Sequence, residues 1–232
     1  MKHYFMKYWP IYVLTSVIFV SSVFLGNKTV MVMADNAPIT RHNTIVIDAG
    51  HGGEDGGATS CSGRLESQFN LDIALRLNDL CHLLGYDTLM IRSTDISVYT
   101  DGNSIAAKKA SDLRQRAHIV NSTPNAILIS IHQNTFSDNR YSGAQVFYAQ
   151  TQGSKELAVK LQELFMHVDS SNHRQAKKSS NVYLMQHIQK TGVLVECGFL
   201  SNPNEEAKLR SSEYQKMLCC VIVSALSNHI NA

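Results

Sequence analysis

The chain alternates short runs of apolar, largely β-branched residues with stretches in which apolar residues recur every three or four positions. The first pattern predicts buried strands, and the second predicts helices with one apolar face. Strands that alternate with helices favour a mainly parallel sheet covered on both faces. The sequence therefore predicts an α/β fold: a single domain with a mostly parallel central sheet and helices on both faces. We expect strands at 44–49, 87–92, 126–132, 143–149, 181–185 and 193–197, and helices at 69–84, 111–120, 154–168 and 213–229.

The composition fits one domain and argues against nucleic acid as a partner. With 232 residues, 44% of them hydrophobic, the chain can fill one sizeable core and leaves little room for a second. The formal net charge is +2 and no dense Lys/Arg block occurs, so nucleic-acid binding is a poor fit. The five cysteines are odd in number and lack CxxC spacing, which argues against a disulfide framework and a zinc ribbon.

Residues 1–40 are interpreted as an export segment with its linker, and 41–232 as the catalytic domain. Lys2 and Lys7 precede an uncharged stretch at 8–27. A basic start followed by a short apolar run is typical of a secretory signal peptide. The stretch also suits an uncleaved membrane anchor, since a spanning helix needs about 20 residues. Either alternative predicts a protein that acts outside the cytoplasm, secreted or in contact with the membrane through this segment.

Four side chains suited to metal chemistry lie at the ends of expected elements. His51 follows the first strand, His132 ends the third, and Glu196 lies near the end of the last. Glu66 lies at the start of the first helix. The carboxyl ends of parallel strands share one edge with the starts of the helices that follow, so all four can meet there. Two histidines and Glu66 would leave a catalytic Zn²⁺ with an open position, and Glu196 would move protons beside it.

Neighbouring residues admit other interpretations. The glycines at 52–57 could form a phosphate loop, but no Lys-Ser/Thr follows them and the GxGxxG spacing is absent. Cys61 lies between two expected ligands, where an ordinary loop cysteine is a simpler interpretation than a thiolate ligand. Cys197 follows Glu196 in an expected strand, so its side chain should point to the opposite face, away from the chemistry.

Several motifs, in order along the chain, closely resemble the zinc-dependent N-acetylmuramoyl-L-alanine amidases of amidase type 3. Any one of these motifs alone would be a weak signal, whereas the ordered set is specific. The resemblance spans nearly all of the chain from about Thr44 to Ile230. It rests on IVIDAGHGGEDGGA (45–58), LESQFNLDIALRL (65–77), DLRQRAHIVN (112–121), ISIHQN (129–134) and VLVECGFLSNPNE (193–205).

The resemblance implies both a reaction and roles for particular residues. It implies Zn²⁺ held by His51, Glu66 and His132, with Glu196 as the catalytic carboxylate. Arg116 and Asn134 are candidate substrate-binding residues. The reaction implied is hydrolysis of the amide bond between N-acetylmuramic acid and L-alanine in peptidoglycan.

The short chain without added wall-binding modules is most similar to germination-specific members, which act on spore cortex. Vegetative wall remains the alternative substrate. Some relatives need a separate activator or anchor protein, and the polar stretch 170–180 is a candidate contact for one. The chain departs from the family pattern at Thr191-Gly192, Ser67 and Gln133, and none of these changes removes a ligand.

Two competing functions fit some of the same residues. The ligand types alone also suit a zinc carboxypeptidase or endopeptidase that acts on the stem peptide. A zinc-bearing, non-catalytic wall-binding or scaffold protein is a further alternative. That alternative predicts loss of the acid/base residue, whereas Glu196 is present in its expected context.

Overall fold

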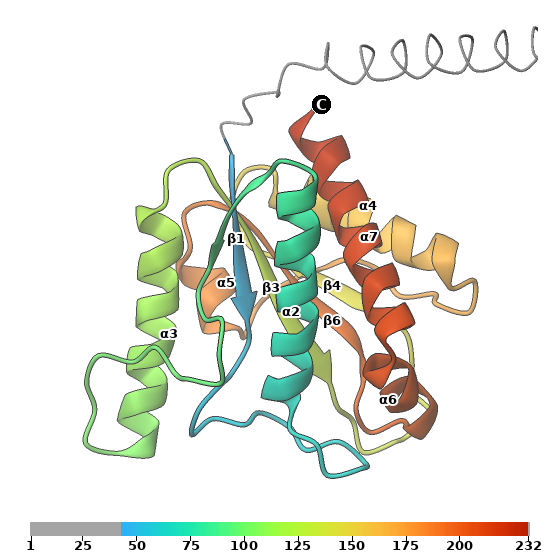
Figure 1. Cartoon of the computed structure of the whole chain (residues 1–232), viewed down its shortest axis with the longest axis horizontal. Coiled ribbons are helices and arrows are strands. Elements are labelled where there is room, and N and C mark those ends of the chain that lie inside the picture. Colours follow the sequence, from blue (N-terminus) through green and yellow to red (C-terminus); the bar gives the residue numbers. More distant parts are fainter. Residues whose placement is uncertain (1–42, 232) are drawn as a thin grey trace, which may run out of the picture. The chain divides into compact units, whose positions relative to one another are not determined.

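The computed structural model describes residues 43–231, so the expected signal peptide or membrane anchor lies outside the described part. Within it, one sheet carries six strands in the order β2-β1-β3-β6-β4-β5. Figure 1 labels four of them, β1, β3, β6 and β4. The strands are β1 (Thr44–Ala49), β2 (Asp87–Met90), β3 (Ala126–Asn134), β4 (Gln145–Tyr148), β5 (Lys177–Lys178) and β6 (Thr191–Phe199). The helices are α2 (Glu66–Leu83), α3 (Ile105–Ser122), α4 (Ser154–Val168), α5 (Tyr183–His187), α6 (Pro203–Arg210) and α7 (Ser212–Ile230).

The sheet is mostly parallel, as the sequence predicts. Strands β2, β1, β3 and β6 pair in parallel, whereas β4 pairs with β6 in the antiparallel sense. The amino-terminal end of β4 therefore lies at the same edge of the sheet as the carboxyl end of β6, and Gln145 stands opposite Glu196. This edge is where the strand-end residues singled out in the sequence gather.

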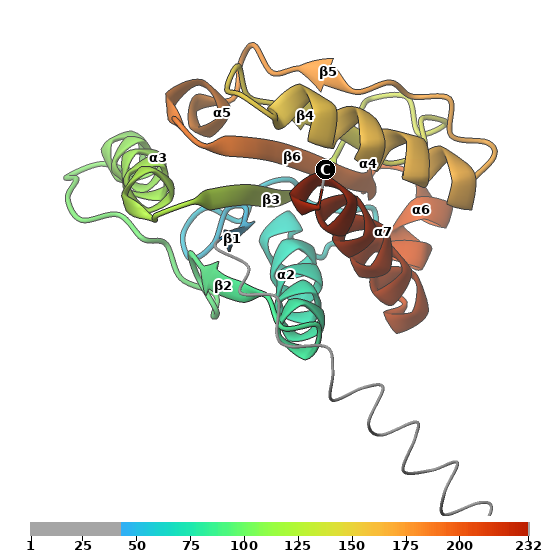
Figure 2. The same ribbon diagram turned by 90° about the horizontal axis from the view of Figure 1, so that it is seen from above.

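Helices cover both faces, as predicted (Figure 2). The larger apolar cluster joins alternate residues of the central strands to the buried faces of α2, α4 and α7. The smaller cluster joins the other strand residues to α3 and α5. None of the helices among residues 43–231 has the length and apolar character that crossing a bilayer requires.

One expected strand is wrong. Residues 181–185 were expected to be extended, but Tyr183–His187 form the helix α5, with Ile188 N donating to Leu184 O at 3.1 Å. Leu184 and its neighbour Met185 are both buried in the smaller cluster. A strand would send consecutive side chains to opposite faces, whereas consecutive side chains of a helix are only about 100° apart and both can reach one cluster.

Three further features differ from the expected elements. The stretch 170–180, expected as a loop, contains the two-residue edge strand β5. Helix α6 was not expected, although Asn202 caps it and Pro203 stands in its first turn, which is a typical helix start. Helix α3 begins earlier than expected, because the Ser104 side chain accepts from Ala107 N at 3.2 Å.

Candidate metal centre

His51 lies in a left-handed turn directly after β1. Its φ is 61°, a backbone conformation that is uncommon for residues other than glycine. Two buried guanidinium groups donate hydrogen bonds to the backbone carbonyls of this turn. Arg92 donates to the carbonyls of Ala49 (2.7 Å) and Gly50 (3.0 Å), and Arg116 donates to the carbonyl of His51 at 2.8 Å. Each of three consecutive carbonyls is therefore fixed by a charged donor, which keeps the imidazole in place.

Arg116 is itself part of a buried ion-pair network. Its guanidinium, 2% exposed, donates to the carboxylates of Asp48 and Asp112 and to the carbonyls of Ala49 and His51. Burial alone would raise the pKa of Asp48, but Arg116, His132 and the hydroxyl of Ser130 together outweigh burial, and the pKa lies below its usual value. The resemblance implied that Arg116 contacts substrate. All three of its guanidinium nitrogens donate to protein oxygens, among them the carbonyl of His51. Arg116 also lines the cavity beside the expected ligands, so its substrate contact stays a prediction.

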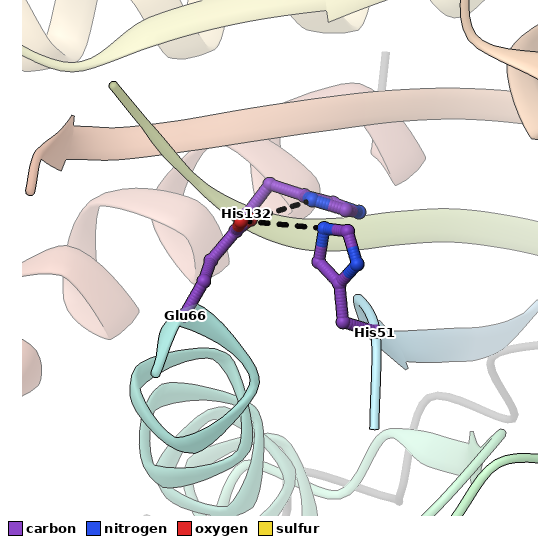
Figure 3. Close-up of side chains that lie close together, drawn as sticks. All are labelled: His51, Glu66 and His132. Carbon is purple, nitrogen blue, oxygen red and sulfur yellow. Dashed lines mark hydrogen bonds and ion pairs between the residues drawn. The ribbon is translucent and has the colours of Figure 1, made fainter. Parts of the chain in front are cut away.

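The three expected ligands come together at the carboxyl edge of the sheet. Glu66, at the start of α2, places Oε2 3.3 Å from Nε2 of His51 and Oε1 3.0 Å from Nδ1 of His132 (Figure 3). One ligand atom from each residue lies within 4.8 Å of the other two. The imidazoles are about one-fifth exposed, whereas the carboxylate is 6% exposed. The carboxylate of the cluster is thus buried, whereas both imidazoles are partly accessible to solvent.

The charge of Glu66 is set by its surroundings. Burial alone would raise its pKa, but hydrogen bonds with His132 and His51 outweigh burial and hold the pKa far below the ordinary range. The backbone N–H groups of Ala58 and Gln133 also donate to this carboxylate, at 2.9 and 3.2 Å. Glu66 is therefore ionised, as a metal ligand must be.

His51 also has a partner on its outer side. Its Nδ1 lies 3.0 Å from Oδ2 of Asp55, and Lys109 pairs with the same Asp55 oxygen at 3.1 Å. A carboxylate on the far nitrogen of a histidine ligand fixes the orientation of the ring and raises its basicity. Our sequence reasoning missed Asp55, although its position four residues after an expected ligand was a usable signal.

At this edge, residues of three neighbouring strands lie side by side as register partners. His132 on β3 is the register partner of Glu196 on β6, and Glu196 is the partner of Gln145 on β4. Gly50 lies on the other side of His132, where a Cβ atom would approach Nε2 to 2.1 Å. The absence of a side chain at Gly50 therefore makes room for the imidazole of His132.

Glu196 stands beside the three clustered ligands and is not one of them. Burial raises its pKa to about 7, and the two nearby histidines only partly offset the effect of burial. Its Oε2 atom is buried and has no hydrogen-bond partner in the described part of the chain. An unpartnered buried carboxylate with a near-neutral pKa suits a group that accepts and returns a proton.

A cavity of about 220 Å³ opens beside the cluster. His51 and His132 line it on one side, and Lys109, Tyr183 and Leu184 line it on the other. Helices α3 and α5 thus form the wall that faces the ligands. The cavity therefore adjoins two of the three expected ligands.

Three other residues singled out in the sequence, Asn134, Cys197 and Cys61, lie outside the ligand cluster. Asn134, half-buried at the end of β3, makes no side-chain hydrogen bond within the described residues, so its amide is available to another molecule. Cys197 is fully buried in the larger apolar cluster, on the face away from Glu196, as expected. Cys61 is exposed and is not part of the ligand cluster.

Comparison with known proteins identifies the family. Residues 45–228 match the sequence profile of the N-acetylmuramoyl-L-alanine amidases. The chain belongs to this family. A germination-specific N-acetylmuramoyl-L-alanine amidase of Bacillus subtilis (strain 168) is 36% identical over 185 residues, which are 78% of this chain and 77% of that protein.

Other members of the amidase family extend the match. The amidase LytC of Bacillus subtilis is 29% identical over 175 residues, 74% of this chain but only 32% of LytC. Among solved structures, the CwlD amidase from Clostridioides difficile, in complex with the GerS lipoprotein, superposes with a TM-score of 0.77. It shares 36% sequence identity, and the match covers 81% of this chain and 98% of that one. The predicted α/β architecture is thus the architecture of an amidase.

Proposed function

We propose that this chain is a zinc-dependent amidase that hydrolyses the bond between N-acetylmuramic acid and L-alanine in peptidoglycan. One observation carries the proposal: a His/Glu/His cluster open to solvent, with Glu196 unpartnered beside it. Family membership supports the amide bond as the target. The His/Glu/His cluster supports catalysis of this hydrolysis by a bound metal ion.

The side chains fit Zn²⁺. Two imidazole nitrogens and one carboxylate oxygen are a set that zinc accepts, and three protein ligands leave a position for substrate or water. His51, Glu66 and His132 would hold the ion. When bound, the ion would lower the pKa of a water molecule toward about 7 and polarise the amide carbonyl.

The protein's own groups would move the protons. Glu196 Oε2 would take a proton from the attacking water and then donate it to the nitrogen of the leaving amine. Its pKa of about 7 allows both steps near neutral pH, and a bound cation would lower that value. Arg92, Arg116 and Asp55 would act as positioning residues, because each contacts His51 or the turn that carries it. Asn134 and Arg116 remain our candidates for a direct substrate contact.

The test is a pair of substitutions measured for both metal content and product. Glu196→Gln keeps the shape of the side chain, so it should bind zinc normally and lose activity by about 100- to 10,000-fold. His51→Ala should lose both metal and activity. Mass spectrometry of digested peptidoglycan should find peptides with a free L-alanine amino group.

Two results would contradict the assignment. Parental activity in Glu196→Gln would exclude the proton-transfer role of Glu196. Products cut within the stem peptide, with the muramoyl link intact, would favour the carboxypeptidase or endopeptidase alternative.

We further propose that the enzyme acts outside the cytoplasm on spore cortex and works with a protein partner. The support is similarity: one relative is named germination-specific, and the CwlD amidase was solved with a lipoprotein. Deleting the gene should change the muropeptides of spores and leave those of growing cells unchanged. The reverse result would point to the vegetative wall. Affinity purification from sporulating cells of the source organism tests for the partner.

A further inference from the structure

Arg174 is an arginine without a carboxylate at ion-pair distance among the described residues. The residue lies between α4 and β5, where its Nε donates to Ser142 O at 2.8 Å and its Nη1 donates to Oε1 of Gln145 at 3.1 Å. Among residues 43–231 it forms no ion pair, and its Nη2 donates to no protein oxygen. Every other buried or half-buried guanidinium discussed above donates to several protein oxygens.

The guanidinium is held in one place. It lies 4.5 Å above the ring of Phe199 and 5.8 Å from the ring centre of Tyr141, and it is only partly exposed. Loss of water lowers the pKa of Arg174, and the nearby Glu205 only partly offsets this. A fixed, partly dehydrated cation with free N–H donors is a binding site for an anion.

The position of Arg174 relative to Glu196 follows from the sheet. Gln145, which holds Nη1, stands directly opposite Glu196 in the antiparallel pair of β4 and β6. Such partners share a face and have Cβ atoms roughly 5 Å apart. Gln145 is 4% exposed and its Nε2 donates to Gln175 O at 3.1 Å, so its amide is fixed at both ends. Arg174 therefore lies one side chain beyond Glu196, on the side away from the metal ligands.

We propose that Arg174 binds a carboxylate on the stem peptide of the substrate, one or two residues beyond the bond that is cut. This inference rests on the proposed function. An extended peptide advances about 3.4 Å per residue, so a carboxylate on the second stem residue lies roughly 7 Å from the scissile nitrogen. That distance is of the same order as the separation between the Glu196 side chain and the Arg174 guanidinium, which lie on either side of Gln145. A planar guanidinium with free Nη2 hydrogens suits a carboxylate better than a neutral amide.

A matched pair of substrates tests the proposal. N-acetylmuramoyl-L-alanyl-γ-D-glutamyl-L-lysine amide carries one free carboxylate, on its second stem residue, and the D-isoglutaminyl analogue replaces that carboxylate with an amide of the same size. The parent enzyme should favour the carboxylate form about ten- to a hundredfold in kcat/KM, mainly through KM. Arg174→Gln should reduce this preference to within about twofold. Arg174→Lys should restore part of the preference.

A control and a binding measurement complete the experiment. Arg140→Gln removes an 87% exposed arginine that pairs with Asp138 in a neighbouring loop, and it should keep the preference. In the Glu196→Gln background, the tripeptide L-alanyl-γ-D-glutamyl-L-lysine amide should bind more tightly than its D-isoglutaminyl analogue, and Arg174→Gln should abolish the difference.

The outcomes separate the two proposals. Equal use of both substrates by the parent, or an unchanged preference in Arg174→Gln, would overturn the role of Arg174 and leave the amidase intact. Failure of the parent to cleave either muramoyl peptide would count against the proposed function. The tripeptide titration would then still decide whether Arg174 recognises a carboxylate.

Discussion

Replacement of Gly50 by alanine should damage the metal centre without disturbing the fold. A Cβ at this position would lie 2.1 Å from Nε2 and 2.3 Å from Cε1 of His132. Ordinary van der Waals contact begins near 3.4 Å, so the ring would have to withdraw by more than 1 Å. Metal–ligand distances tolerate only about 0.2 Å. Gly50 does not have a positive φ, so the substitution adds a clash and no backbone strain.

We expect Gly50→Ala to weaken zinc binding by at least about 100-fold, because changes that act on a ligand only through its supports already cost 10- to 100-fold. Competition with a chromophoric chelator measures the affinity, and far-ultraviolet circular dichroism checks the fold. Gly63→Ala is the control: its φ is 90°, and no atom lies within 4 Å of the added Cβ, so only local strain is introduced. Unchanged zinc affinity in Gly50→Ala would refute the reasoning.

Two more outcomes are expected from the electrostatics of the site. Asp55→Asn removes the carboxylate 3.0 Å from Nδ1 of His51 and should lower zinc affinity by about 10- to 100-fold in the same titration; an unchanged affinity would rule out the positioning role. In chelator-treated protein, Glu196 has a pKa of about 7 against an ordinary 4.5, so the folded state binds more protons than the unfolded state between these values. Stability should therefore fall as pH rises through that window. The Tm of the parent should drop relative to Glu196→Gln from pH 5 to 8, and parallel curves would contradict the assigned burial effect.

The sequence predicted those parts of the structure that depend on local patterns. The run Thr44–Ala49 ends at a glycine, and the apolar spacing of 69–84 fixes one helix face, so both elements could be assigned before any coordinates. The meeting of His51, Glu66 and His132 followed from one general rule, that the carboxyl ends of parallel strands share an edge. The distances between the three side chains could not be derived from the sequence.

Other features depend on contacts that leave no pattern in the chain. Arg92 donates to backbone carbonyls, which every residue type supplies, so nothing in the sequence marks its partners. The reversed direction of β4 is set by how the chain returns to the sheet and not by the residues of the strand. Met185 and its neighbours are too few for a period of two to be told from a helical turn.

The two arginines under the His51 turn bear on how the enzyme would acquire its metal. Small zinc domains commonly fold only when the ion binds, because the ion itself draws the ligands together. Here Arg92 and Arg116 hold the first ligand's backbone through contacts that involve no ion. The backbone position of the first expected ligand therefore depends on protein contacts. Binding of the proposed Zn²⁺ would then be separable from folding, and metal supply would set activity after the chain has reached its final shape.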